Sequence, residues 1–64
     1  MEWKQYICAD PAVLYGKPAI KGTRISVDLI LEKLSTGETV EQLLQSYPHL
    51  SKETILACLA FASQ

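Results

Sequence analysis

The sequence predicts a mainly α fold, in which a three-helix bundle with a helix-turn-helix follows a short N-terminal β-hairpin or extended arm. Three segments repeat the apolar spacing of an amphipathic helix, and capping residues stand at their ends. The first 25 residues instead hold short β-prone runs separated by proline and glycine. We expect a single domain overall, with residues 1–25 as the arm and residues 26–64 as the three-helix part.

The arm is predicted to contain two short strands. Tyr6-Ile7-Cys8 and Ala19-Ile20-Lys21 are the β-prone runs, and the chain between them is interrupted at Asp10-Pro11 and at Tyr15-Gly16-Lys17-Pro18. Pro18 has no N–H to donate, so a strand there lies at an edge or begins at that residue. Two strands alone are marginal in water, and we therefore expect the arm to pack on the helices or on a second copy.

The first helix is expected over residues 26–36. Its stripe has the spacing i, i+3, i+4, i+7 and consists of Val27, Ile30, Leu31 and Leu34. Ser26 precedes the stripe as an N-cap, and Gly37 follows it where a left-handed residue commonly ends a helix.

The second and third helices are expected over residues 39–47 and 51–62. Their stripes have the same spacing and consist of Val40, Leu43, Leu44 and Tyr47 and of Ile55, Cys58, Leu59 and Ala62. Thr39 and Gln42 predict a capping box, Pro48 stops the second helix, and Ser51 caps the third. The short connection suits a helix-turn-helix, yet Lys52 is the third helix's only cation, which disfavours direct base reading.

Composition and charge narrow the function. The chain is 48% hydrophobic with a net charge of −1, which excludes a disordered chain and disfavours a basic nucleic-acid module. The charge is uneven, at +2 over residues 1–24 and −3 over residues 25–64. We expect phosphate or acidic partners to meet the cations of the arm, which are Lys17, Lys21 and Arg24. We also expect a cytoplasmic location, since no signal peptide or membrane span is evident.

Catalytic and metal-binding patterns are missing from the sequence. One histidine and two distant cysteines, Cys8 and Cys58, do not make a zinc set, and the thiols are expected to be reduced and structural. No nucleophile or acid–base motif is present, so we expect neither an enzyme nor a cofactor. Apolar residues outside the stripes instead predict an association surface; they are Leu29, Leu56 and Phe61. The apolar composition and the small size of the chain predict a homodimer.

The run from Gly16 to Val27, Gly-Lys-Pro-Ala-Ile-Lys-Gly-Thr-Arg-Ile-Ser-Val, resembles the signature Gly-x-Pro-x-Ile-x-Gly-Thr-Arg-Ile-x-Val of the domain-of-unknown-function 433 family (DUF433). The similarity extends over about residues 5–64. The resemblance implies a homeodomain-like helical fold and an antitoxin of a toxin–antitoxin system. The partner that it implies is a PIN-like ribonuclease toxin, with operator DNA left open as a second partner.

Two functions remain in view. The leading hypothesis is a non-enzymatic, antitoxin-like binding protein, and the alternative is a small homodimeric helix-turn-helix transcriptional regulator whose main partner is DNA. The turn motif, which consists of Gly16, Pro18, Gly22 and Thr23, is compatible with a purely structural role beside Arg24. In that structural interpretation, the Thr23 hydroxyl satisfies backbone groups and Arg24 reaches carbonyls or Asp28.

Overall fold

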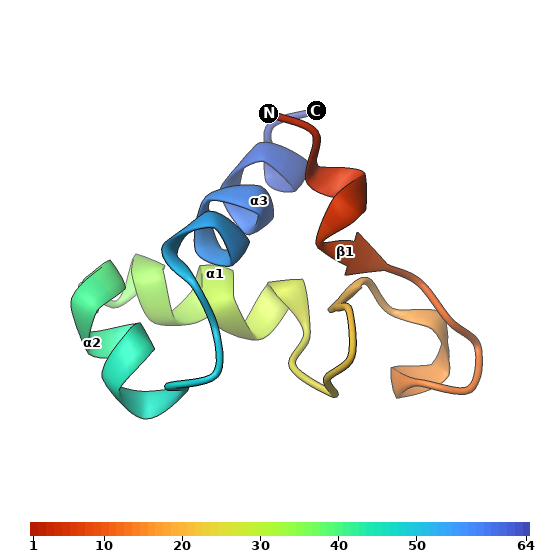
Figure 1. Ribbon diagram of the computed structural model, residues 1–64, viewed down its shortest axis with the longest axis horizontal. Helices are drawn as coiled ribbons and strands as arrows, with labels where there is room; N and C mark the ends of the chain where they lie inside the picture. The colour runs from red at the N-terminus through yellow and green to blue at the C-terminus, as the bar shows by residue number, and fades with distance from the viewer.

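The computed structural model describes all residues, 1–64, and consists of three α-helices, two 3₁₀ turns and a two-stranded antiparallel sheet (Figure 1). The order along the chain is η1 (Trp3–Gln5), β1 (Ile7–Cys8), η2 (Leu14–Gly16), β2 (Ala19–Ile20), α1 (Val27–Ser35), α2 (Val40–Ser46) and α3 (Lys52–Ala62). The predicted mainly α fold with an N-terminal hairpin is confirmed, whereas the two 3₁₀ turns were not expected. None of the helices combines the length and apolarity needed to cross a membrane.

The helices begin where the capping residues predicted. The Ser26 Oγ accepts the Leu29 N–H at 3.0 Å at the start of α1. At α2, the Thr39 N–H donates to the Gln42 Oε1 at 2.8 Å and the Thr39 Oγ1 accepts the Gln42 N–H at 3.1 Å, which completes the capping box. Each cap satisfies backbone donors that have no partner inside the helix.

Gly37 ends α1 in the left-handed conformation that its position predicted, with φ +98°. Its N–H donates to the Leu34 carbonyl at 3.1 Å, and the Glu38 N–H reaches the Lys33 carbonyl at 3.2 Å. This pair of bonds is the Schellman pattern of helix ends. The Lys33 Nζ and the Glu38 Oε2, 3.6 Å apart, form the chain's one ion pair.

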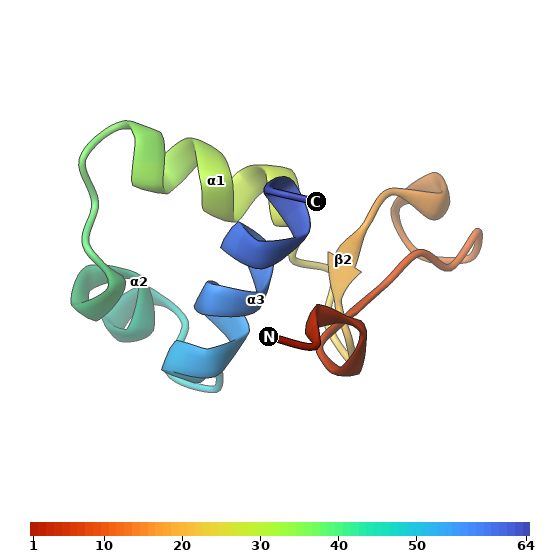
Figure 2. The same cartoon turned by 90° about the horizontal axis from the view of Figure 1, so that it is seen from above.

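The hairpin is joined to the start of α1. Ile7 pairs with Ile20, and Cys8 pairs with Ala19. On the other edge of β2, the Ile20 N–H donates to the Ile25 carbonyl at 2.9 Å, and the Val27 N–H donates to the Pro18 carbonyl at 3.0 Å. The arm is therefore fixed on both sides of β2. Its long connecting loop lies at the end of the molecule opposite α2 (Figure 2).

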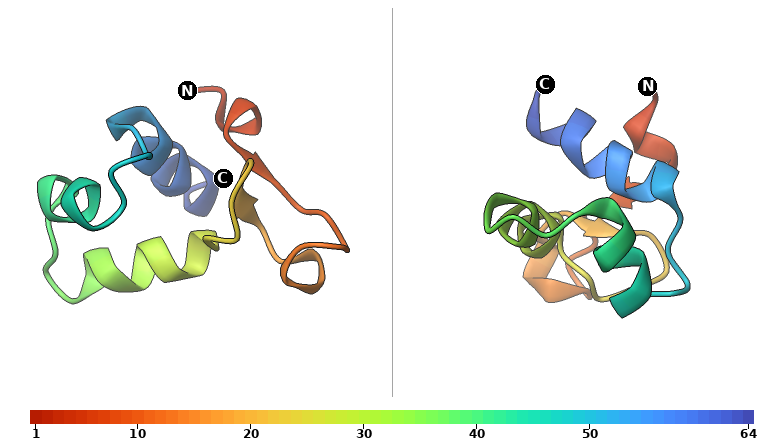
Figure 3. Two further views of the ribbon diagram at one scale, coloured as in Figure 1. Left: turned by 60° about the horizontal axis from the view of Figure 1, so that its bottom comes forward. Right: turned by 90° about the vertical axis from the view of Figure 1, so that its left-hand side faces the viewer.

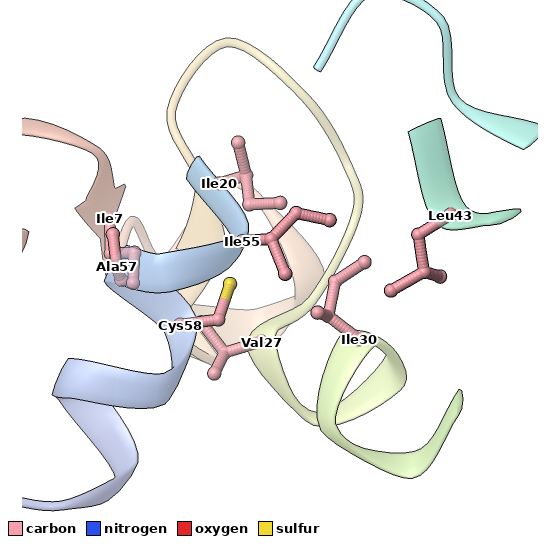
Figure 4. Close-up of a cluster of buried hydrophobic side chains, with 8 residues drawn as sticks. All are labelled: Ile7, Ile20, Val27, Ile30, Leu43, Ile55, Ala57 and Cys58. Carbon is pink, nitrogen blue, oxygen red and sulfur yellow. The ribbon is translucent and has the colours of Figure 1, made fainter. Parts of the chain in front are cut away.

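One hydrophobic core joins the arm to the helices. Its eight members come from both strands and all three helices and lie around α3 (Figure 4); they are Ile7, Ile20, Val27, Ile30, Leu43, Ile55, Ala57 and Cys58. The stripes predicted for α1 and α2 all face this core. Because Ile7 and Ile20 belong to the same cluster as the helices, the arm and the helical part form one folding unit.

The face predicted for α3 is correct for Ile55 and Cys58, which are buried in the core, and wrong for Leu59. Leu59 is 43% exposed rather than buried, while Thr54 and Ala57, which lie outside the predicted stripe, are buried. Phe61 also packs on the core, where its ring meets that of Trp3 edge-on with centroids 4.8 Å apart. Thus Phe61 does not belong to an outer surface. After its first turn the helix is apolar on all sides, so its sequence allows more than one face to be buried. Its position between α2 and η1 determines which face is buried (Figure 3).

Cys58 is fully buried, and burial raises the pKa of its thiol from 9.0 to about 11. Native protein at pH 8 is therefore expected to react with a thiol reagent at Cys8, which is half-buried, and to react at Cys58 only after unfolding. A Cys8→Ser variant isolates the second thiol. Equal rates for the two thiols would contradict the burial.

The same shift makes stability depend on pH. Between pH 9.0 and about 11, the unfolded chain loses the Cys58 proton while the native protein still holds it. The unfolded state then binds fewer protons, so the free energy of unfolding falls as the pH rises through this window. Urea titrations of the wild type and of Cys58→Ala at several pH values in this window give the free energy of unfolding of each protein against pH. The difference between the two slopes of free energy against pH measures the contribution of Cys58.

Candidate functional site

The turn between β2 and α1 is held by Gly22 and Thr23. Gly22 has a φ of +77°, and a Cβ there would meet nothing within 4 Å, so glycine is required by the backbone conformation rather than by crowding. The Thr23 Oγ1 donates to the Ile20 carbonyl at 2.8 Å and accepts the Ile25 N–H at 3.0 Å. Both residues therefore have the structural role that the turn motif allows.

Arg24 differs from its two neighbours in the turn. It is exposed and forms neither a hydrogen bond nor an ion pair through its guanidinium. The structural interpretation in which Arg24 reaches a carbonyl or Asp28 therefore does not apply to this side chain. A long cationic side chain without an intramolecular partner is available to a ligand, and its planar donors suit carboxylates and phosphates.

Two open hollows meet at Arg24. The larger, of about 450 Å³, is lined by Cys8, Asp10, Val13, Gly22, Thr23 and Arg24. The smaller, of about 240 Å³, is lined by Pro11, Ala12, Leu14, Tyr15 and Arg24. We call this surface the arm surface, because its walls come from the loop after β1 and the turn after β2. Arg24 is its only cation.

Tyr15 projects from the arm surface in an unusual backbone conformation. Leu14 and Tyr15 have φ values of 51° and 56°, and Gly16 follows with 86°. A left-handed conformation costs an L residue roughly 1–2 kcal/mol. The Tyr15 side chain is fully exposed, so its own burial does not offset that cost. Sequence reasoning missed this residue because nothing in its local pattern distinguishes it from an ordinary turn residue.

Comparison with known proteins identifies the family of the chain. Residues 7–62 match the family described as "Protein of unknown function (DUF433)". The chain belongs to the DUF433 family. An uncharacterized protein, y4eO, of Sinorhizobium fredii (strain NBRC 101917 / NGR234) is 29% identical to this DUF433 chain over 59 residues, which are 92% of the chain and 27% of that protein. The chain thus spans about a quarter of the curated relative's length, and no solved structure matches it.

The three cations predicted for the arm do not lie together, and two of them, Lys17 and Lys21, stand at variable positions of the DUF433 signature. Lys17 and Lys21 are exposed, and neither lines a hollow with Arg24. Pro18 directly precedes β2, and its carbonyl accepts the Val27 N–H. Of the three predicted cations, only Arg24 belongs to the arm surface.

The apolar residues predicted as an interface in this DUF433 chain are also separated. Leu29 is half-buried on α1, Leu56 on α3 is 39% exposed, and Phe61 packs on the core. Leu59, three residues after Leu56, is the exposed apolar neighbour that the helical spacing had assigned to the core. The candidate site therefore has two parts, the arm surface and the exposed leucines of α3.

Proposed function

We propose that this DUF433 protein is a non-enzymatic, cytoplasmic binding protein that neutralises a PIN-like ribonuclease toxin, as an antitoxin does. The exposed leucines of α3, Leu56 and Leu59, are the observation that supports this most. Residues three apart are neighbours on a helix surface, so their side chains form one apolar patch. Covering such a patch with another protein is favourable by roughly 25 cal/mol for each Å² of apolar surface removed from water.

The charge of the helices also suits this partner. Residues 25–64 carry a net charge of −3, and exposed carboxylates stand on every helix, for example Asp28, Glu41 and Glu53. A ribonuclease needs positive potential to attract the phosphates of RNA. An acidic helical surface therefore competes for the surface on which RNA binds.

Co-expression with the nuclease-like protein encoded beside the gene tests the proposal. We expect the wild-type chain to co-purify with that protein and to suppress its RNA cleavage. The double variant Leu56→Asp and Leu59→Asp should lose most of this binding, because it places two charges in a surface that must be desolvated. Gln45→Asp, on the exposed surface of α2, is the matched control and should retain binding.

Two results would overturn the proposal. One is recovery of the chain alone from a locus without a nuclease-like neighbour. The other is full suppression of cleavage by the double leucine variant, with helix content by circular dichroism equal to that of the wild type. The exposed positions of both leucines make loss of the fold in this variant unexpected.

The alternative function, a homodimeric transcriptional regulator, is favoured by the arrangement of α2, a short turn and α3. DNA binding through phosphate contacts would weaken linearly in log affinity with log salt. The outer surface of α3 carries Leu56, Leu59 and the single cation Lys52, which supply little for base reading. A gel-shift with the gene's own promoter at low salt distinguishes the two functions, and we expect no specific complex.

A further inference from the structure

The arm surface combines a free cation, free backbone donors and an exposed aromatic ring. We infer that it is a docking site for an acidic segment of a protein, whose carboxylate binds Arg24 and whose neighbouring apolar side chain packs on Tyr15. This inference rests on the proposed function only in taking the partner to be a protein. It concerns a surface separate from the leucines of α3.

Donors for a carboxylate lie on two residues that line the larger hollow. The Arg24 guanidinium has no partner in the chain. The backbone N–H groups of Gly22 and Arg24 likewise donate to no oxygen of the protein, whereas those of Lys21, Thr23 and Ile25 are all bonded. Arginine binds carboxylates through two parallel N–H bonds, and backbone donors at a tight turn add to such a site.

The charge around the larger hollow favours a single carboxylate over a nucleic-acid backbone. Asp10 lines the same hollow, with its Oδ1 held by the Ala12 N–H at 2.9 Å, and no second cation lines the hollow beside Arg24. A DNA duplex brings one negative charge for roughly every 1.7 Å of its axis. The Asp10 carboxylate repels such a dense array of phosphates. A single carboxylate can bind Arg24 while Asp10 stays hydrated.

The smaller hollow provides the apolar half of the site. Tyr15 is fully exposed and borders this hollow together with Pro11, Leu14 and Arg24. Tyrosine and arginine are the residue types that contribute most to protein interfaces, since a tyrosine offers a large apolar area with few rotatable bonds. The two hollows share Arg24, so an acidic side chain and its apolar neighbour reach both at once.

Titration of the ¹⁵N-labelled full chain tests this site. The probe is an acetylated and amidated tetrapeptide with one carboxylate, Gln-Leu-Glu-Leu, and the control peptide has glutamine in place of the glutamate. We expect saturable shifts of the Gly22, Thr23 and Arg24 amides with the acidic peptide only. Arg24→Gln should weaken this binding about tenfold or more, since it removes a charge-assisted hydrogen bond. Lys17→Gln, an exposed cation outside both hollows, should bind as the wild type does.

Several outcomes would overturn the inference. These are equal shifts with both peptides, unchanged binding in Arg24→Gln, or larger shifts of the same amides with a short DNA duplex at equal ionic strength. The double variant Leu56→Asp and Leu59→Asp should still bind the acidic peptide. If the acidic peptide does not bind while the wild-type chain co-purifies with the nuclease, only the inferred docking site is contradicted. If the peptide binds and the chain does not co-purify with the nuclease, only the proposed toxin partner is contradicted.

Discussion

Ile55→Ala should lower the free energy of unfolding by about 2–5 kcal/mol, which is the usual cost of truncating a large buried aliphatic side chain. Ile55 is completely buried on α3, within the cluster that joins the arm to the helices. A domain of this size has a total stability of roughly 3–10 kcal/mol. The variant therefore loses a large share of the total stability. Urea titration followed by circular dichroism measures this loss in the free energy of unfolding.

Leu59→Ala is the matched control, since the apolar spacing of the sequence assigns both residues to one stripe. Leu59 is 43% exposed and lies outside the core, so its truncation should change stability by no more than about 0.5 kcal/mol. If Ile55→Ala is unfolded in water, Ile55→Val, with an expected cost of about 0.5–1.5 kcal/mol, keeps the comparison measurable. Equal losses at the two positions would contradict the orientation of α3.

The helix boundaries could be predicted because their determinants are local. Ser26, Thr39 and Ser51 cap the helices through bonds to residues three positions later, and Gly37 ends α1 by its own backbone freedom. The orientation of α3 could not be predicted in this way. Its sequence is apolar on all sides, and the buried face depends on where η1, α1 and α2 lie in space.

The candidate site was predictable only in part, for a related reason. The signature directed attention to Gly22, Thr23 and Arg24, and all three line the larger hollow. Sequence alone could not separate the bonded Thr23 from the free Arg24, because that difference lies in atomic distances. Tyr15 was missed since it lies in a turn of two consecutive left-handed residues, a conformation for which neither leucine nor tyrosine has a preference.

Thr23→Val should lower the free energy of unfolding by about 2 kcal/mol. The substitution keeps the shape of the side chain and removes the hydroxyl that joins the turn to both β2 and the segment before α1. The Ile20 carbonyl keeps the Thr23 N–H at 3.1 Å, but the half-buried Ile25 N–H loses its acceptor. An unsatisfied buried donor costs roughly 1–3 kcal/mol. Thr23→Ser retains the hydroxyl and should recover most of the loss.

Thr36→Val provides the control for Thr23→Val. Its hydroxyl donates to the Lys33 carbonyl at 2.8 Å on an exposed helix end, where water replaces the bond, and the expected change is within about 0.5 kcal/mol. Arg24→Gln should also leave the unfolding curve unchanged, because Arg24 has no intramolecular partner. Within one turn, stability then depends on Thr23 and ligand binding on Arg24. A destabilised Arg24→Gln variant, or an unaffected Thr23→Val variant, would contradict this division of roles.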